Sequence, residues 1–224
     1  IKKVKVDTVI NCATYYSNKN DIKTIQHLTQ TNIIFCSIIL EILKDKIKKF
    51  INFGSMMEYS SGNHFSPKNF YAITKHSFQK IEEFYKLNNK KIKFYNLKLF
   101  ETYGDCDKRK KIIPTIIKLY SQNKNIKIVS KKLEMNFVHI ESLQIAINMI
   151  ISNKVKEGEY CIKNNKFTNI RELINKLNKK LKIKIKTNYL SSKTFSNSSK
   201  QLKKFPYWED NKNLEKFLLD RLTR

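Results

Sequence analysis

The sequence predicts an α/β fold in which helices cover both faces of a parallel sheet. In the first hundred residues, apolar strand segments alternate with long helical patterns. A strand–helix–strand order at this spacing forms βαβ units, because parallel strands need a crossover connection. We expect strands at 4–12, 50–53 and 92–100, and helices at 21–44 and 67–87.

Residue patterns justify each of these elements. Apolar side chains recur every three or four positions in 21–44, as one face of a helix requires. The run VKVDTVINC at 4–12 has the apolar, β-branched character of a strand buried on both faces. A Gly-Ser pair ends the strand at 50–53, and IKFYNLKLF at 92–100 alternates in the way a strand does.

From about residue 105 the pattern becomes less regular. We expect helices at 112–120, 142–151, 170–181 and 211–222, strands at 126–129, 137–140 (strand or loop) and 160–162, and a Ser/Lys-rich loop at 191–200. A chain of 224 residues is long enough for two lobes. We therefore predict a core at 1–104 and a smaller α/β lobe at 105–224, with elements around 135–153 that return to the core.

The net charge of +26 raises the question of a nucleic-acid partner. Only four of the 45 basic residues are arginine, the side chain that base readout and phosphate clamping favour. The lysines are scattered and are not interleaved with stacking aromatics. We interpret them as a solvated, compositionally biased surface and expect no nucleic-acid partner, although attraction to an anionic small substrate is compatible with this charge.

Cysteine usage and hydropathy indicate a cytoplasmic protein. The four cysteines and four histidines are dispersed and contain no C-x-x-C pair, so neither a metal site nor a disulfide framework is expected. Free thiols fit a reducing compartment. The longest apolar stretch, 33–43, is too short to span a bilayer, and 1–6 does not resemble a signal peptide. We expect no membrane partner.

Three residues form a candidate catalytic set. Tyr71 and Lys75 lie four residues apart on one predicted helix and therefore share a face. A neighbouring cation favours the phenolate form of a tyrosine, which can then exchange a proton with a carbinol. Ser55 follows a predicted parallel strand, at the carboxyl edge where α/β sheets bind ligands.

Each of these signals is weak alone. A Y-x-x-x-K spacing arises easily by chance in a lysine-rich chain, where the usual structure is a half-buried aromatic beside a solvated lysine. A serine after glycine is more often a turn or cap residue. The combination of Ser55, Tyr71 and Lys75, in this order and on these elements, is more specific.

Motifs along most of the chain extend the pattern. VDTVINCAT at 6–14 is similar to D-x-V-I-H-x-A-A, and FYAITK at 70–75 to P-Y-x-x-S-K. LKLFETYG at 97–104 is similar to L-R-x-F-N-x-Y-G, and NFVHI at 136–140 to R-D-F-V-H-V-D-D. On these motifs the chain resembles the extended short-chain dehydrogenases that act on nucleotide sugars, the NAD-dependent epimerase/dehydratases. Within that family it is most similar to the reductases and epimerases of CDP-linked deoxyhexoses.

The resemblance implies a Rossmann-like core, NAD or NADP as cofactor and a nucleotide-sugar substrate. It places the cofactor at Cys12, Ala13, Thr14, Phe53, Tyr71, Lys75 and Phe100. It places the substrate at Ser55, Met56, Glu101, Ile113 and Met135. It puts Asn32 at the position of the family's helix asparagine. It also implies a homodimer formed through helices that include 21–44 and 67–87.

The chain departs from the family pattern at its beginning. The family's glycine-rich phosphate loop is absent, since the four glycines at 54, 62, 104 and 158 cannot form it. The pattern begins at the family's fourth strand, so that roughly sixty residues and about three strands of the expected fold are not represented. We therefore expect an open sheet edge and no turnover by this chain alone.

Local departures narrow the expected reaction. Met56 and Met57 replace the Asp-Glu pair of 4,6-dehydratases, and thioethers cannot transfer the required proton. Glu101 stands in place of the usual asparagine, and Met135 in place of a phosphate-binding arginine. We expect a nucleotide-sugar 4-ketoreductase or epimerase. The alternatives are a 4,6-dehydratase or a non-catalytic truncated fragment.

Overall fold

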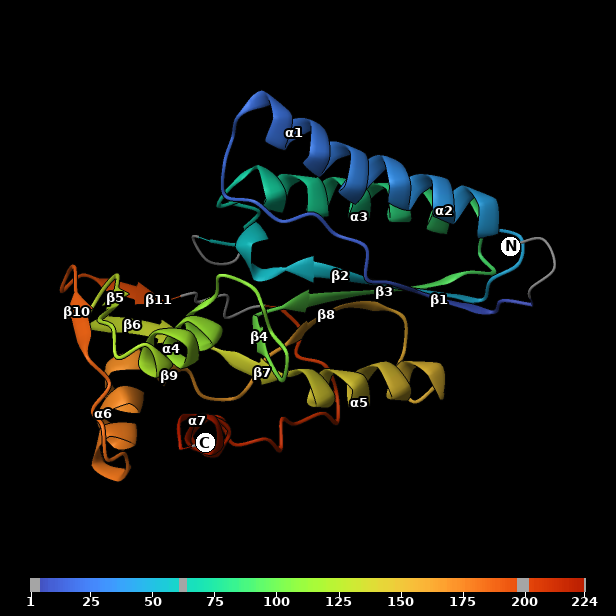
Figure 1. Cartoon of the computed structure of the whole chain (residues 1–224). Coiled ribbons are helices and arrows are strands. Elements are labelled where there is room, and N and C mark those ends of the chain that lie inside the picture. The colour runs from blue at the N-terminus through green and yellow to red at the C-terminus, as the bar shows by residue number, and fades with distance from the viewer. Residues whose placement is uncertain (1–4, 61–63, 197–201, 224) are drawn as a thin grey trace. The chain divides into compact units, whose positions relative to one another are not determined.

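The structure, a computed structural model, describes residues 5–60, 64–196 and 202–223 (Figure 1). The chain forms two compact units, and each is described here by itself. The first unit consists of Ile1–Leu99, Ile147–Ile162 and Ser198–Pro206. The second unit consists of Phe100–Ala146, Lys163–Asn197 and Tyr207–Arg224.

These boundaries differ in detail from those expected. The chain passes from the first unit into the second after residue 99 and not after 104. The reason is that strand β4 (Glu101–Tyr103) pairs with β7 (Phe137–His139) inside the second unit. The returning segment is 147–162 and not 135–153, because β7 pairs with β4 in the second unit and β8 (Gly158–Ile162) pairs with β3 (Lys93–Leu99) in the first. A further segment, 198–206, also belongs to the first unit.

The first unit is built on a four-stranded parallel sheet. Its strands are β1 (Thr8–Asn11), β2 (Lys49–Ser55), β3 (Lys93–Leu99) and β8 (Gly158–Ile162). Their order is β1-β2-β3-β8, with β1 at one edge. The predicted α/β class with a parallel sheet is confirmed. The strand expected at 4–12 is shorter within the described residues, and residue 4 lies outside them.

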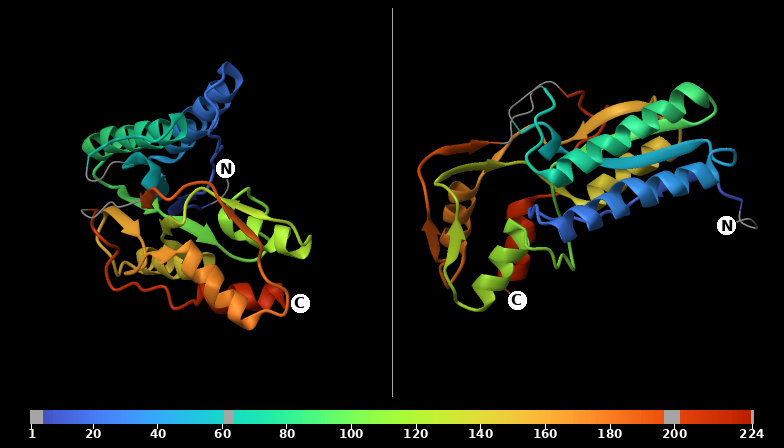
Figure 2. Two further views of the ribbon diagram at one scale, coloured as in Figure 1. Left: turned by 90° about the vertical axis from the view of Figure 1, so that its left-hand side faces the viewer. Right: turned by 90° about the horizontal axis from the view of Figure 1, so that it is seen from above.

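The two predicted helices lie side by side on one face of this sheet (Figures 1 and 2). The first is continuous but consists of three parts, α1 (Ile22–Thr29), a π-helical stretch η1 (Gln30–Phe35) and α2 (Cys36–Leu43). The second, α3, spans Phe70–Asn88. It begins later than residue 67 because the Asn69 side chain caps it, accepting a hydrogen bond from Ala72 N at 3.0 Å.

Apolar packing between helices and sheet is concentrated at the amino end of the strands. Phe50 of β2 contacts the rings of Phe78 on α3 and Phe94 on β3, with centroids 6.0 and 6.1 Å apart. Leu40 and Cys36 of α2 join this cluster. These side chains are buried and hold the helix layer to the sheet.

A polar row crosses the sheet where such interiors are usually apolar. The register pairs Asn11 with Asn52, Asn52 with Asn96, and Asn96 with Glu159. Asn11 Nδ2 donates to Asn52 Oδ1 at 3.1 Å. The carboxylate oxygen Oε2 of Glu82, from α3, accepts from Asn52 Nδ2 at 3.2 Å and from Asn96 Nδ2 at 2.9 Å. Asn52 and Asn96 therefore join two strands to α3.

The described part of the second unit contains four helices and several short strands. The helices are α4 (Ile112–Ser121), α5 (Ile140–Ile151, which continues into the first unit), α6 (Ile170–Lys180) and α7 (Leu214–Leu222). Besides β4 and β7, the strands are β5 (Ile126–Ile128), β6 (Lys132–Met135), β9 (Thr168–Asn169), β10 (Thr187–Tyr189) and β11 (Thr194–Ser196). No described helix has the length and apolar character needed to cross a membrane.

The strand pairs of this unit correct one expectation. Residues 191–200 were expected to form a loop, but β11 pairs in parallel with β6 within that range. Residues 197–200 lie outside the described residues. Polar side chains such as Thr194 and Ser196 gave no strand signal, because the pairing depends on a partner far away in the sequence.

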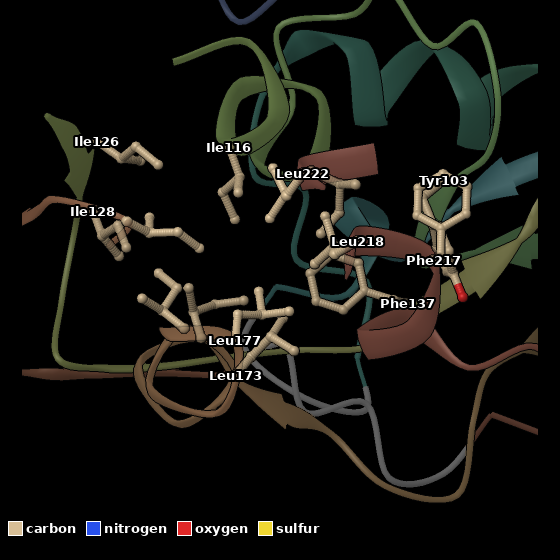
Figure 3. Packing of buried hydrophobic residues seen from close by; sticks show 14 of the residues in the cluster. Tyr103, Ile116, Ile126, Ile128, Phe137, Leu173, Leu177, Phe217, Leu218 and Leu222 are labelled. Atoms are coloured by element: carbon tan, nitrogen blue, oxygen red, sulfur yellow. The ribbon is translucent and has the colours of Figure 1, made fainter. Parts of the chain in front are cut away.

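One hydrophobic cluster holds the second unit together (Figure 3). Leu173 and Leu177 of α6 face Ile116 of α4 and Leu218 of α7 in this cluster. The ring of Tyr103 packs edge-on against Phe137 and Phe217, with centroids 6.4 and 5.0 Å apart. Helices α4, α6 and α7 therefore share one apolar interior.

Replacing Leu177 with alanine should destabilise the second unit. Its side chain is fully buried, and a Leu→Ala change at such a site costs about 2–5 kcal/mol. Urea denaturation should show the loss. Leu190→Ala, at a position that is 63% exposed, is the matched control and should change the free energy of unfolding by less than about 0.5 kcal/mol.

The stability of the first unit should fall as the pH rises towards 8. Burial raises the pKa of Glu82 to about 8, against hydrogen bonds from Asn96 and Asn52 that lower it. An unfolded glutamate titrates near ~4.3, so between these two pH values unfolding releases a proton that the folded state holds. One proton corresponds to about 1.4 kcal/mol per pH unit.

Glu82→Gln should flatten this slope in urea denaturation measured between pH 5 and 8. The neighbouring exposed Glu83→Gln should keep the wild-type slope. Equal slopes in the wild type and in Glu82→Gln would show that Glu82 does not hold a proton in the folded protein.

Candidate active site

Ser55 is the last residue of β2, at the carboxyl end of the sheet. Its hydroxyl oxygen accepts a hydrogen bond from Met57 N at 3.1 Å and so caps a single 3-10 turn, η2 (Met56–Glu58). The Glu58 carboxylate closes a capping box by accepting from Ser55 N at 2.7 Å. Ser55 therefore has the cap role noted above, and this role fixes where its hydroxyl lies.

Tyr71 and Lys75 lie in the first two turns of α3. Tyr71 is half-buried, and the ring of Tyr16 packs edge-on against it with centroids 5.0 Å apart. Lys75 is only 2% exposed. The ordinary structure for such a pair, an aromatic beside a solvated lysine, is therefore not the one found here.

The end of β2 and the start of α3 are tied together. Lys68 N donates to Met57 O at 2.9 Å, and Asn69 Nδ2 lies 4.0 Å from Met57 Sδ. Ser55 thus precedes a turn that contacts the residues just before Tyr71. The first unit brings the elements of the predicted set to the same edge of its sheet.

The surroundings of Lys75 are unusual for a lysine. Burial lowers the pKa of its ammonium, while nearby Cys36, Glu82 and Glu58 act to raise it when they carry a negative charge. No described residue offers a hydrogen-bond acceptor to this ammonium. The Lys75 ammonium could therefore donate hydrogen bonds to the hydroxyl groups of a ligand, such as the ribose of the expected cofactor.

The segment after β1 contains the expected cofactor residues Cys12, Ala13 and Thr14. Burial raises the pKa of the Cys12 thiol, and the charge of Lys75 acts to lower it. Asn32 fixes this segment from the π-helical stretch. Its Oδ1 accepts from Thr14 Oγ1 at 3.2 Å and from Tyr15 N at 2.8 Å.

Asn32 also reaches helix α3. Its Nδ2 donates to Thr74 Oγ1, the residue next to Lys75, at 3.0 Å, and to Tyr15 O at 3.0 Å. Asn32 is fully buried with its amide engaged on both sides. It therefore links the expected cofactor segment to the helix that carries Tyr71 and Lys75.

A charged cluster lies behind Ser55. The ammonium of Lys98 pairs with Glu58 and donates to Gln79 Oε1 at 2.5 Å. Gln79 Nε2 in turn donates to Glu159 Oε2 at 2.7 Å. Gly54 leaves room for this lysine, since a Cβ there would lie 2.5 Å from Lys98 Cδ. The cluster holds Glu58, and through it the backbone of Ser55.

The remaining expected residues differ in what the structure shows for them. Phe53 of β2 is half-buried and Met56 is buried, both in the first unit. Phe100, Glu101, Ile113 and Met135 belong to the second unit. Glu101 pairs with Lys111 at 3.1 Å, and the Ile113 side chain is buried in the hydrophobic cluster, so a ligand would meet only its backbone.

Sequence reasoning missed the residues that support this site. Glu82, Asn52 and Asn96 were not singled out, although polar residues inside apolar strand runs are the available signal. Asn52 stands in KFINFGS and Asn96 in KFYNLKL. A buried asparagine in a parallel strand needs a partner, and two of them on neighbouring strands predict a shared one.

A family model agrees with this arrangement. The model described as the NAD dependent epimerase/dehydratase family matches residues 1–162. CDP-abequose synthase of Yersinia pseudotuberculosis is 33% identical over 156 residues, which cover 69% of this chain and 53% of that protein. CDP-abequose synthase of Salmonella muenchen is 24% identical over 190 residues, covering 83% of this chain and 64% of that protein. The chain thus spans less than two thirds of the length of these relatives.

Solved structures agree with the fold. UDP-glucuronic acid 4-epimerase from Bacillus cereus, solved with UDP-glucuronic acid and NAD, matches 97% of this chain and 76% of its own, with a TM-score of 0.81 and 21% identity. RMD from Pseudomonas aeruginosa, solved with NADPH, matches 99% of this chain and 82% of its own, with a TM-score of 0.78 and 16% identity. The Rossmann-like fold is confirmed. With the family model matched over residues 1–162 and a curated relative 33% identical, the chain belongs to the NAD dependent epimerase/dehydratase family of nucleotide-sugar-modifying enzymes.

Proposed function

We propose that this chain carries the proton-transfer residues of an NAD(P)-dependent nucleotide-sugar 4-ketoreductase or epimerase. The observation that carries the proposal is Lys75. It is buried one helical turn after Tyr71 and has no acceptor among the described residues. Burying a lysine side chain is costly, and ionisable groups in such places are frequent at functional sites.

Each residue has a role in the proposed reaction. Tyr71 transfers a proton to or from the sugar oxygen, and the positive charge of Lys75 stabilises the phenolate that results. Ser55 holds the sugar oxygen beside Tyr71, from a hydroxyl whose position is fixed by its cap. When bound, NAD or NADP supplies or accepts the hydride. Reduction and epimerisation both use these three residues.

We further propose a CDP-linked 4-keto sugar as the substrate. The curated relatives with 33% and 24% identity are both CDP-abequose synthases. Dehydration is disfavoured, because Met56 and Met57 offer no group that could transfer a proton at the turn after Ser55.

Tyr71→Phe should abolish turnover in the full-length protein while leaving cofactor binding in place. The phenol is the proposed proton donor, and loss of such a group slows a reaction by about 10²–10⁴-fold or more. Turnover is measured with NADH or NADPH and a panel of CDP- and UDP-linked 4-keto sugars.

Tyr85→Phe, further along the same helix, is the matched control and should keep wild-type turnover. A near-wild-type rate in Tyr71→Phe would refute the assigned role. A full-length wild-type protein that binds cofactor but turns over none of these sugars would favour a non-catalytic protein.

We also propose that the protein forms a homodimer through the helices of the first unit. Along η1 and α2, Ile34, Phe35, Ile38 and Ile42 are 41–51% exposed at helical spacing. On the neighbouring helix α3, Phe84 and Leu87 are 60% and 80% exposed. Apolar side chains gathered on adjacent helices favour a second copy of the same face as partner.

Ile38→Asp combined with Phe84→Asp should convert the dimer to a monomer, because two buried carboxylates per copy would oppose association. Light scattering after size-exclusion chromatography measures the mass. Ile183→Asp, at a 58% exposed position of the second unit, should leave the dimer intact. A monomeric wild type would contradict the proposal.

A further inference from the structure

Glu82 is a buried acid that the proposed reaction does not use. It lies seven residues after Lys75 on α3, which is close to two full turns and therefore the same face of the helix. Its side chain accepts from Asn52 and Asn96 through Oε2 alone. Among the described residues, its Oε1 and the nearby Asn96 Oδ1 have no hydrogen-bond partner.

Two buried acceptors without a donor indicate a missing proton. A protonated Glu82 provides an O–H donor in this layer, whereas an ionised one leaves a charge with only two neutral donors. The raised pKa of about 8 agrees with this geometry. Glu82 thus changes its charge close to neutral pH.

The ionisable groups discussed next also lie near Lys75, but they do not change their charge close to neutral pH. Burial raises the pKa of the Cys36 thiol, as it does that of Cys12, so both stay neutral. Burial also acts to raise the pKa of Glu58, but His76 and Lys98 outweigh it and the net pKa is lowered, so Glu58 stays ionised. Lys98 is bonded to Glu58 and Gln79.

Glu82 also faces neutral groups on the neighbouring strands. Asn52 and Asn96 donate to it, and Asn11 lies next to Asn52 and bonds the Cys36 sulfur at 3.3 Å. The cations near Glu82 are Lys98 and Lys75. Apart from Tyr71, the proposed proton-transfer group, Glu82 is therefore the group near Lys75 whose charge changes near pH 8.

We propose that Glu82 is a positioning residue for Lys75, which by releasing its proton supplies the negative charge that keeps the buried ammonium charged as the pH rises. This inference rests on the proposed function, in which a charged Lys75 is needed to stabilise the Tyr71 phenolate. Glu82 touches neither substrate nor cofactor in this scheme. It acts only through Lys75.

The expected size of the effect follows from the distance along the helix. Seven residues at 1.5 Å each separate the two positions by about 10 Å. At an effective dielectric of about 20, one charge at that distance shifts a titration midpoint by about one pH unit. Glu82→Gln removes the charge but keeps the shape of the protonated acid, so the fold should be retained.

Titration of the Lys75 side chain by NMR tests the proposal without turnover. The chain is prepared with lysine labelled with ¹³C at the ε carbon, and the Lys75 signal is identified by its absence from Lys75→Arg. In Glu82→Gln its midpoint should move to lower pH by about one unit. In Glu83→Gln, a control at the neighbouring exposed position, the midpoint should stay at the wild-type value.

An unchanged midpoint in a folded Glu82→Gln protein would overturn the proposal. If that variant does not fold, the wild type decides. In the wild type labelled with ¹³C at its glutamate carboxyls, one carboxyl should titrate near pH 8. The Lys75 signal should show an inflection at the same pH. The absence of this inflection would also overturn the proposal.

Kinetics of the full-length protein separate this inference from the proposed function. The alkaline limb of the pH–rate profile should move to lower pH in Glu82→Gln, whereas a purely structural role would lower the rate at every pH. An inactive wild type would refute the proposed function and leave the NMR result as a statement about Lys75. An active enzyme whose profile is identical in both proteins would overturn the role of Glu82.

Discussion

The parallel register of β1, β2, β3 and β8 places Asn11, Asn52, Asn96 and Glu159 side by side across the sheet. A shift of one residue in β2 or β3 would turn Asn52 or Asn96 to the other face and leave Glu82 without one of its donors. Because buried polar groups are costly when unpaired, this row strongly favours one register. That register also sets where each strand ends.

The position of the candidate site follows from these strand ends. Ser55 closes β2 and caps η2, and Glu58 is held by Lys98 from the adjacent strand. Asn32 connects the segment after β1 to Thr74 on α3. The site is therefore supported by buried side-chain hydrogen bonds from several elements, which restrict its residues more than apolar packing alone does.

The same polar layer makes the site sensitive to charge. Lys75 and Glu82 are both buried, and burial disfavours the charged form of each. Lys98 and Lys75 are the cations near Glu82, and Glu82 is one of the acidic groups near Lys75. In the proposed scheme, the residues of the site are held in fixed positions while the pKa of the Lys75 ammonium depends on the charge of Glu82.

Local patterns were enough to predict most of the first unit. The helical spacing in 21–44 and the apolar strand runs correspond to α1, η1 and α2 and to β1, β2 and β3. The Y-x-x-x-K spacing placed Tyr71 and Lys75 on one helix face, because that relation is contained within a single element. The short strands β4, β6, β9, β10 and β11 were not predicted, because each is three or four residues or fewer and depends on a distant partner.

The sequence by itself determined the fold class, the family motifs and the identities of Ser55, Tyr71 and Lys75, because these depend on residue type and on spacing within one element. Only the tertiary structure decided that Lys75 is buried, that Asn32 links the two sides of the site and that Glu82 of α3 accepts hydrogen bonds from the polar row of the sheet. The physical reason is that burial and hydrogen-bond partnership are set by strand register and helix packing, which join residues far apart in the chain.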